Sequence, residues 1–427
     1  MKNLTPTSQT LAQKLIARAA GRAAVMPGEI VNCKVDLAMF HDSSGPRRLK
    51  PMLEELGAHI WDKSKVVLVM DHYVPERDDE SRKIVRIARE WAQEQALPHV
   101  YDSQGICHVV VPQNGHIRPG MFCVGGDSHS PTGGAFGAYM FGIGSTEMLG
   151  VVVTGEIWLR VPHTQQMHWR GQLAKGVTAK DMMLHMTGRF GMNGGQYQAV
   201  EFCGAAVRAL SMQERMTLSN MSAELGAQVG LIAPDEVTAA WLKTTGVPET
   251  ATAWPDGFTD AGADLTRHDF DASTLTPYVA APHSPANAHE VARYSGTRVD
   301  VAYIGACTGA KLDDLRAAAD VLRGQRVAAG VRLMVAPASL QDQRAAEKEG
   351  VLQVLLDAGA ELFPTACGAC AGYGETLGDN TTVISSTARN FKGRMGSATA
   401  QVYLASPYTV AASALRGVIT DPREVLQ

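Results

Sequence analysis

Short apolar runs alternate with longer stretches of helical periodicity along this chain, and this alternation constrains its fold more than any other feature. The runs have the length and composition of buried strands and lie at 66–70, 121–124, 299–304, 331–335 and 382–384. Helical patterns occur at 82–95, 312–322 and 339–348. Strands that alternate with helices form mostly parallel sheets covered by helices, so the sequence predicts an α/β fold. Ligands of such sheets bind beyond the carboxyl ends of the strands, where most polar motifs of this chain fall.

The chain is long and nearly balanced in charge. Its 427 residues exceed the size at which a single core stops growing, so two or three domains around a cleft are expected. With 45% hydrophobic and 19% charged residues and a formal net charge of -4, the composition is that of an ordinary globular protein, without the basic surplus that favours nucleic acid as a partner. The most apolar stretch, 135–153, contains several glycines and Glu147, which favours a buried core segment over a membrane span.

The cysteines and the linker signals bound the location and the domain organisation. Seven cysteines are scattered through the chain, and residues 1–24 lack the apolar core of a secretory signal, so we expect reduced or metal-bound thiols and a cytoplasmic location. Prolines among polar residues predict a linker between about 250 and 295. The chain is therefore predicted to divide into residues 1–285, with two intertwined α/β domains, and residues 286–427, with a third.

Three cysteines are placed to converge on one site. Cys367 and Cys370 form a C-x-x-C motif, and Cys307 follows the predicted strand 299–304. The motif serves zinc, iron–sulfur clusters and thiol–disulfide exchange alike, so a metal or cluster site and structural or redox cysteines both remain open on spacing alone. Three cysteines suit a cluster with one open iron better than a four-ligand zinc site. Buried, inert thiols are expected at the remaining positions, Cys33, Cys107, Cys123 and Cys203.

Histidines and carboxylates gather where predicted strands and turns meet. The members of this group are Asp71, His72, His108, Asp127 and His129. An aspartate beside a histidine orients the ring and stabilises its charged form, which suits the protonation of a departing hydroxyl. A single pair of this kind is more often a hydrogen-bonded turn. Several of them at strand ends favour a catalytic site.

Two arginines and one isolated acid complete the candidates. Arg389 and Arg394 lie five residues apart in a loop after the predicted strand 382–384. Arginine binds a carboxylate through paired hydrogen bonds, so this loop suits a di- or tricarboxylate, although a solvated basic loop gives the same pattern. Glu201 lies in an otherwise apolar stretch, where a structural salt bridge and a catalytic role are equally compatible with the sequence.

The ordered set of motifs resembles the aconitase superfamily, and within it the short large subunits of the 3-isopropylmalate dehydratase and homoaconitase type. The resemblance covers nearly the whole chain. Besides the cysteine and arginine motifs, it is carried by the segments 124–130, 133–147, 201–204 and 215–221. It implies three α/β domains around a cluster-containing cleft, without the swivelling fourth domain of single-chain aconitases. It also implies a small swivel-domain subunit of about 160 to 200 residues, an ordinary size for one domain, in a heterodimer or heterotetramer.

The resemblance assigns roles to individual residues. It implies a 4Fe-4S cluster on Cys307, Cys367 and Cys370, with one open iron that binds substrate as a Lewis acid. The implied catalytic positions are Asp71, His72, His108, Asp127, His129 and Glu201. The implied substrate-binding positions are Ser128, Arg389 and Arg394. Two departures leave the substrate open, because the asparagines that the family usually carries in these motifs are Gly309 and Ala388 here.

The prediction that follows is a hydro-lyase large subunit. Its reaction is the reversible dehydration and hydration, with or without net isomerisation, of a small 2-hydroxy di- or tricarboxylate such as 3-isopropylmalate, citramalate or a dimethylmalate. Two alternatives remain. One is a catalytically altered relative that acts as an iron- or redox-responsive binding protein, and the other is a zinc-dependent hydrolase.

Overall fold

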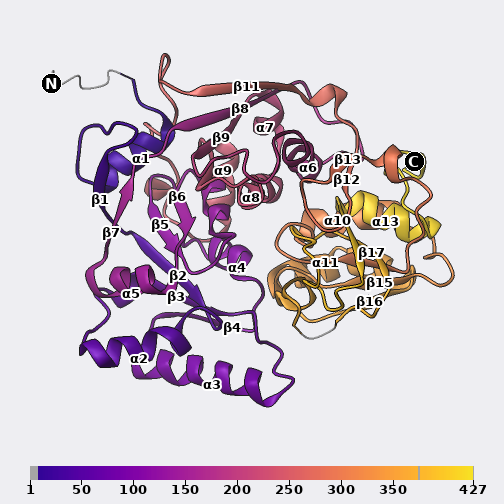
Figure 1. Ribbon diagram of the computed structural model, residues 1–427, viewed down its shortest axis with the longest axis horizontal. Helices are drawn as coiled ribbons and strands as arrows, with labels where there is room; N and C mark the ends of the chain where they lie inside the picture. Colours follow the sequence, from indigo (N-terminus) through magenta and orange to yellow (C-terminus); the bar gives the residue numbers. More distant parts are fainter. Residues whose placement is uncertain (1–7, 374–375, 427) are drawn as a thin grey trace.

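A five-stranded parallel sheet organises the N-terminal part of the chain (Figure 1). The computed structural model describes residues 8–373 and 376–426. The strand order is β4-β3-β2-β5-β6, formed by β2 (Leu37–His41), β3 (Val66–Met70), β4 (His99–Asp102), β5 (Phe122–Gly125) and β6 (Tyr139–Gly142). Its connecting helices are α2 (Pro46–Leu56), α3 (Asp79–Glu94), α4 (Cys107–Gln113) and α5 (Ser145–Thr154). Every residue of β3 is buried, as its apolar sequence predicts.

A second, four-stranded parallel sheet has the order β10-β9-β8-β11. It is formed by β8 (Thr164–Arg170), β9 (Ala199–Cys203), β10 (Val229–Ile232) and β11 (Thr266–Asp271). The helices around it are α6 (Ala179–Phe190), α7 (Ala205–Ala209), α8 (Met212–Met221) and α9 (Glu236–Thr244). An antiparallel ribbon of β1 (Ile30–Lys34) and β7 (Glu156–Arg160) lies beside α1 (Leu11–Ala19). The expected linker at 250–295 is wrong in part, because β11 lies within it and pairs with β8 along six residues.

The C-terminal part is built on a seven-stranded sheet with the order β13-β12-β18-β17-β14-β15-β16. Its strands are β12 (Tyr278–Ala280), β13 (Ala288–Glu290), β14 (Val301–Ile304), β15 (Arg332–Val335), β16 (Ala360–Leu362), β17 (Thr382–Ser385) and β18 (Gln401–Ala405). Its helices are α10 (Leu312–Leu322), α11 (Leu340–Lys348), α12 (Val351–Asp357) and α13 (Pro407–Arg416). Because β12 starts at residue 278, this sheet begins slightly before the predicted boundary at 285, which stays a prediction.

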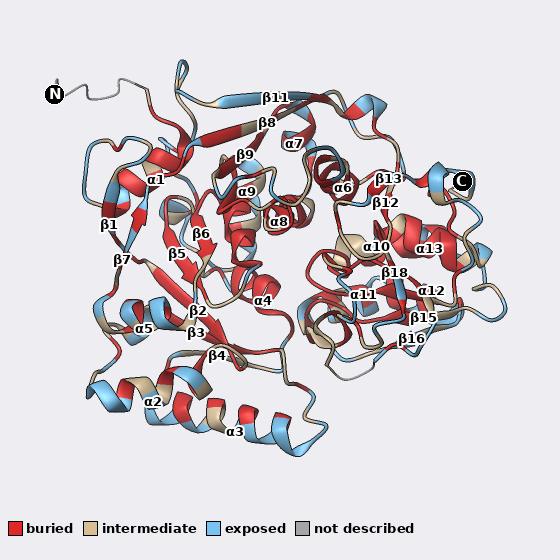
Figure 2. Cartoon of the chain, viewed as in Figure 1, coloured by how far each residue is buried: buried red, intermediate tan, exposed pale blue. Residues whose placement is uncertain are grey.

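One hydrophobic core runs across both parts and fixes their relative position (Figure 2). The same buried cluster includes Val109 of α4, Met216 of α8 and Ile304 of β14. Burying these apolar side chains together makes the contact between the parts more than a loose hinge. Loops from the two parts therefore face each other in a fixed geometry. No helix in the described part of the chain has both the length and the apolar character needed to cross a membrane.

Candidate active site

The carboxyl ends of three neighbouring strands bring the predicted histidines and aspartates together. β3, β2 and β5 are adjacent and parallel, so the residues that follow them lie at one edge of the sheet. Asp71 follows β3, and Asp127 follows β5. His41, the last residue of β2, lies between them and is followed by Asp42, two residues that sequence analysis missed. The sequence does mark these two residues, because His41 and Asp42 directly follow the apolar run 37–40, just as Asp71 and His72 directly follow the apolar run of β3.

Asp127 is the hub of this cluster. Its Oδ1 lies 2.7 Å from His108 Nε2 and accepts a hydrogen bond from the His129 amide at 2.8 Å. Its Oδ2 lies 3.7 Å from His41 Nε2 and 3.8 Å from His72 Nε2. Burial opposes ionisation, but the charge of His108 and the imidazoles around it hold the pKa of Asp127 well below its usual range. Asp127 is therefore a carboxylate that faces four histidines.

His72 is held in its protonated form. Its Nδ1 lies 2.7 Å from Asp71 Oδ1, and the other Asp71 oxygen accepts a hydrogen bond from the Cys107 amide at 2.7 Å. The His72 ring stacks on His41 with 3.8 Å between ring centroids. Burial disfavours the charged ring, but the Asp71 carboxylate, followed by Asp127, outweighs it and raises the pKa of His72 to about 10. His72 therefore keeps a proton to deliver at neutral pH.

This pKa makes the stability of the folded chain depend on alkaline pH. An imidazolium whose folded-state pKa is raised from 6.5 to about 10 contributes stability that is fully present below pH 6.5 and is lost as the pH rises to about 10. We expect the free energy of unfolding to fall between pH 7 and pH 10 by up to about 4 kcal/mol. In calorimetric melting, the free energy of unfolding of His72→Asn should fall less over this pH range than that of the wild type. The exposed control His163→Asn should keep the wild-type slope, and an unchanged slope in His72→Asn would contradict this assignment.

Glu224 is a central residue that sequence analysis missed. It lies in the loop after α8 with no exposed surface, and its Oε1 lies 3.0 Å from His129 Nε2 and accepts from Arg389 Nε at 2.6 Å. Burial opposes its ionisation, but Arg389 and His129 lower the pKa of Glu224. Its second oxygen, Oε2, is buried without a hydrogen-bond partner in the described part of the chain. A buried unpaired acceptor is costly, so this oxygen suits a bound hydroxyl or water.

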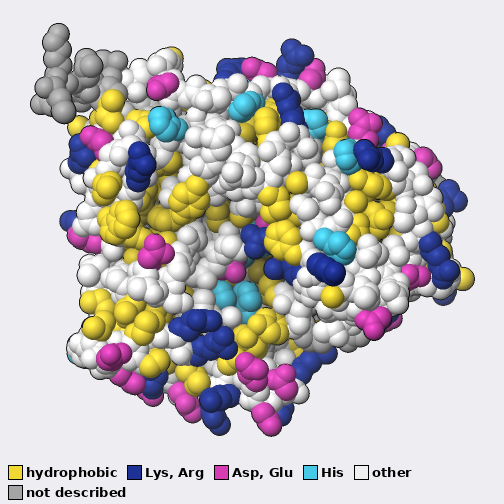
Figure 3. Space-filling view, viewed as in Figure 1, with side chains coloured by type: hydrophobic (Ala, Val, Ile, Leu, Met, Phe, Trp, Pro, Cys, Tyr) yellow, Lys and Arg dark blue, Asp and Glu magenta, His cyan; other side chains and the backbone are white. Residues whose placement is uncertain are grey.

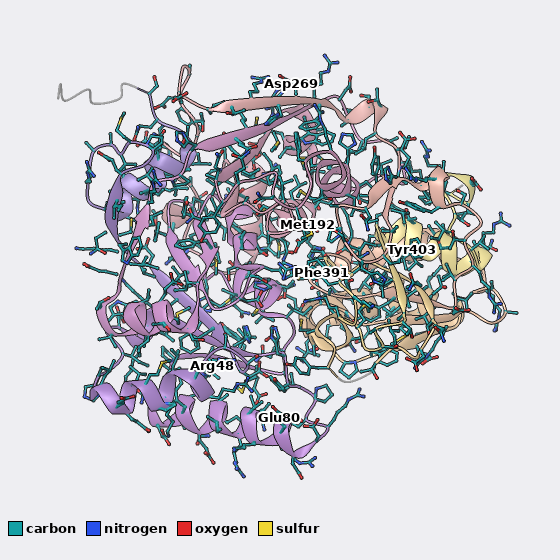
Figure 4. The ribbon with its side chains drawn as sticks, viewed as in Figure 1. Arg48, Glu80, Met192, Asp269, Phe391 and Tyr403 are labelled. Atoms are coloured by element: carbon teal, nitrogen blue, oxygen red, sulfur yellow. The ribbon has the colours of Figure 1, made fainter. Side chains whose placement is uncertain are left out.

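The first arginine joins the two parts of the chain. Besides contacting Glu224, Arg389 donates from Nη1 to Ser128 Oγ at 2.9 Å. Two nitrogens of its guanidinium are thus fixed, and the remaining N–H groups are left to meet an anion. Ser128 and Arg389 also line the same cavity, together with Asp127. Figure 4 shows Phe391, between the two arginines in sequence, at the border between the C-terminal part and the rest of the chain.

Glu201, by contrast, lies in a different environment. It is buried in the middle of β9, where Gln166 Nε2 donates to its Oε1 at 3.3 Å and the Thr259 hydroxyl donates to its Oε2. Burial raises the pKa of Glu201, and these hydrogen bonds offset part of the rise. None of these partners belongs to the histidine cluster. The observed contacts fit the structural alternative for Glu201 and not the catalytic position.

The three cysteines lie on two loops next to the histidine cluster. Cys307 follows β14, and its sulfur accepts from Asn220 Nδ2 at 3.2 Å. The Cys367 and Cys370 thiols are hydrogen bonded to each other, which lowers the pKa of Cys370 to about 5 although burial opposes it. The Cys367 amide donates to the Asp71 carbonyl at 2.9 Å, so this loop is tied directly to the histidine cluster.

The surroundings of these thiols fit an iron–sulfur cluster. Thiolates are the protein ligands of such clusters, and Arg394 helps to hold Cys370 in that form. Arg394 Nε is buried without a hydrogen-bond partner among the described residues, which leaves a donor for an inorganic sulfide. Gly368 has open space on its side-chain face, since a Cβ at this position would lie 4.0 Å from its nearest neighbour, the Tyr373 carbonyl oxygen. Both features provide for a bulky group beside the C-x-x-C motif.

The structure explains the two unusual residues of the motifs. A Cβ at Gly309 would lie 2.2 Å from Ser386 Oγ, so the Ser386 hydroxyl occupies the space of a larger residue. That hydroxyl accepts from the Gly305 amide at 2.9 Å. Ala388 is buried in an apolar cluster with Leu404. A polar group thus remains beside Gly309, whereas position 388 has become part of the core.

The cluster of polar side chains lies in an accessible hollow. Figure 3 shows histidine and acidic side chains at its bottom, with lysine and arginine side chains along the edge formed by the C-terminal part. A cavity of about 420 Å³ opens over Asp127, Ser128 and Arg389. A carboxylate and an arginine therefore line a cavity that suits a ligand the size of a small dicarboxylic acid.

Comparison with known proteins agrees with this geometry. The sequence matches the aconitase family (aconitate hydratase) over residues 13–295 and 289–417. The chain belongs to the aconitase family. It is 44% identical to 3-isopropylmalate dehydratase large subunit 1 of Methanopyrus kandleri over 98% of this chain and 100% of the relative. It is 42% identical to the probable methanogen homoaconitase large subunit of Methanosarcina mazei over 92% of this chain and 99% of the relative. The crystal structure of Thermococcus kodakaraensis aconitase X aligns at 13% identity with a TM-score of 0.49, covering 84% of each chain.

Membership of this family confirms several sequence predictions. The α/β aconitase-like fold and the hydro-lyase class are confirmed, and an iron–sulfur cluster follows from the family. The alternative of an iron-responsive binding protein is not favoured, and the zinc-dependent hydrolase gains no support. Family membership alone does not assign roles to individual residues or identify the cluster ligands.

Proposed function

We propose that this chain is the iron–sulfur large subunit of a hydro-lyase acting on a small 2-hydroxy di- or tricarboxylate, with Cys307, Cys367 and Cys370 as cluster ligands. The observation that carries the proposal is that Asp127 and Arg389 line one cavity, with protonated His72 beside Asp127 and the Cys367 loop hydrogen bonded to Asp71. When bound, the cluster supplies a Lewis acid for the substrate hydroxyl. A thiol-held cluster suits a reducing compartment, so we place the protein in the cytoplasm.

Different residues of the site have different roles in dehydration. Arg389, oriented by Glu224 and Ser128, binds a substrate carboxylate, and Arg394 holds Cys370 and completes the positive side of the hollow. His72 donates a proton from Nε2 to the departing hydroxyl, and Asp71 stabilises its charge before transfer. In the hydration direction the same ring recovers the proton. His108 and His129 keep Asp127 ionised and orient a water or hydroxyl near it.

Two observations support the proposed substrate class: an arginine placed to bind a carboxylate, and the names of the relatives. Arginine at the hollow requires an anionic substrate, and names of relatives point to 3-isopropylmalate or homoaconitate chemistry. Citramalate and a dimethylmalate present the same 2-hydroxy diacid and remain in the proposed set. The relatives are named large subunits, so we also propose a small swivel-domain subunit as partner.

The direct test is dehydration of a substrate panel. The chain, reconstituted anaerobically with iron and sulfide and mixed with the small subunit from the same genome, should convert at least one of these 2-hydroxy acids to an alkene that absorbs in the ultraviolet. Iron-dependent binding of the acids without turnover of any of them would instead support the binding-protein alternative.

Arg389→Lys is expected to lower kcat/KM by roughly 10 to 1000-fold. Lysine keeps the charge, but it cannot contact Glu224 and Ser128 while also presenting paired N–H groups to a carboxylate. Steady-state kinetics against the exposed control Arg86→Lys measures the loss. Equal kinetics in both variants would mean that the arginine loop does not bind substrate.

A further inference from the structure

The outer face of the β1–β7 ribbon carries large apolar side chains that the fold leaves uncovered. Alternation along β7 buries Ile157 and Leu159 and turns Trp158 outward, where 68% of its surface is exposed. On β1 the outward-facing Ile30 is 69% exposed. Figure 3 shows hydrophobic side chains gathered over β1 and β7, on the same face of the molecule as the histidine hollow. Tryptophan is seldom so exposed, and a group of exposed apolar side chains often marks a site of interaction with another molecule.

A groove connects this ribbon to the mouth of the hollow. One cavity of about 460 Å³ is lined by Trp158, Ile143, Tyr197 and Gln228. The last three also line the cavity of about 420 Å³ that contains Asp127 and Arg389. The two cavities therefore form a continuous surface from Trp158 to the reacting groups, with Tyr197 at the junction.

Tyr197 is held outward by a strained backbone. Gln196 and Tyr197 are adjacent non-glycine residues with φ of 48° and 55°, in the left-handed region. This conformation is disfavoured for residues with a Cβ and persists only where neighbouring contacts impose it. Here the Tyr197 amide donates to the Gly226 carbonyl and the Gln198 amide to the Gly195 carbonyl, each at 2.8 Å. These hydrogen bonds hold the backbone in the strained conformation, which leaves the Tyr197 side chain 63% exposed at the mouth of the hollow.

We infer that this aromatic groove, from Trp158 to Tyr197, is the docking surface for the small subunit. The inference rests on the proposed function, because the hollow needs a body that closes it, and a body seated on the groove stands directly over Asp127 and Arg389. Exposed tryptophan and tyrosine are the residues that most often anchor protein interfaces. Arg160, exposed at the groove, makes no ion pair within the described residues, so the partner should present apolar side chains with an acidic group opposite Arg160.

The test measures binding of the small subunit that restores turnover to the wild-type chain. By isothermal titration, Trp158→Ser and Tyr197→Ser should each raise Kd by about 30-fold, the scale of an interface hot spot. The matched controls Leu56→Ser and Phe258→Ser remove exposed apolar side chains away from the groove and should leave Kd unchanged. At saturating small subunit, Trp158→Ser should recover wild-type kcat, because Trp158 lies outside the hollow.

A further variant separates docking from folding. Tyr197→Gly removes the ring and relieves the left-handed strain, so its melting temperature should equal or exceed that of the wild type while its affinity for the small subunit falls. Groove variants that bind as tightly as the controls would overturn the docking surface and leave the proposed function intact. If instead the wild-type chain alone is a dimer that Trp158→Ser makes monomeric in sedimentation, the groove binds a second copy and the inference fails. Absence of any activating small subunit would count against the proposed function itself.

Discussion

Cys370→Ser should be unable to hold a complete iron–sulfur cluster. We expect the wild-type chain, purified without oxygen, to contain close to four irons and four sulfides, with one iron lost readily in air. Cys370 is the thiol whose ionised form the structure supports best, through Cys367 and Arg394, and serine offers a far weaker ligand for iron. Iron and sulfide analysis, together with the visible absorbance of the cluster, should show nearly complete loss. Cys307→Ser and Cys367→Ser should behave in the same way.

Cys33→Ser is the matched control for this prediction. Cys33 lies fully buried in β1, where its thiol contacts the Ile16 carbonyl, and burial raises its pKa to about 12. Its core cluster contains none of the three proposed ligands, so its replacement should leave the metal content unchanged. Full cluster occupancy in Cys370→Ser would remove this residue from the ligand set. Loss of the cluster in Cys33→Ser would point to a general effect on folding.

Much of the fold followed from local pattern, because buried parallel strands are continuous apolar runs. The run 66–70 coincides with β3, and the helical pattern 312–322 coincides with α10. The clustering of Asp71 and Asp127 was also predictable, since parallel strands end at one sheet edge. What failed was β11, a polar strand at the edge of its sheet that pairs with β8 about 100 residues earlier in the chain. Its sequence lacks the apolar signal that marked the other strands.

The misplacement of Glu201 and the omission of Glu224 have different physical causes. Successive side chains of a strand point to opposite faces, and sequence does not say which face meets the hollow. Val200 and Phe202 pack in the core on one side of β9, and Glu201 between them faces Thr259. Glu224 follows a helix rather than a strand, so it is not among the polar residues at strand ends that the sequence marks. Only the three-dimensional path of that loop brings it between His129 and Arg389.

The chain by itself, even with a complete cluster, should show no hydro-lyase activity, and the small subunit should restore it. Dehydration needs an acid for the hydroxyl and a base on the opposite side for the carbon-bound proton. The first is provided by His72, whose Nε2 lies 3.8 Å from Asp127. The carboxylates of the hollow make poor bases, because their neighbouring cations lower the pKa values of both Asp127 and Glu224, although burial opposes this. Within the described residues around the hollow, we find no other candidate beyond serines such as Ser385 at the end of β17, which is fully buried and hydrogen bonded to Thr387.

The open hollow gives a second reason for this dependence. Bulk water reaches Asp127 and Arg389 through the cavity of about 420 Å³ and screens the charges on which the chemistry depends. A partner that closes the cavity would strengthen each of these contacts and bring the missing base to the substrate. Ultraviolet assays of alkene formation should therefore stay at background for the reconstituted chain and rise in proportion to added small subunit until the two are equimolar. Steady turnover by the 427-residue chain alone would place the base within this sequence.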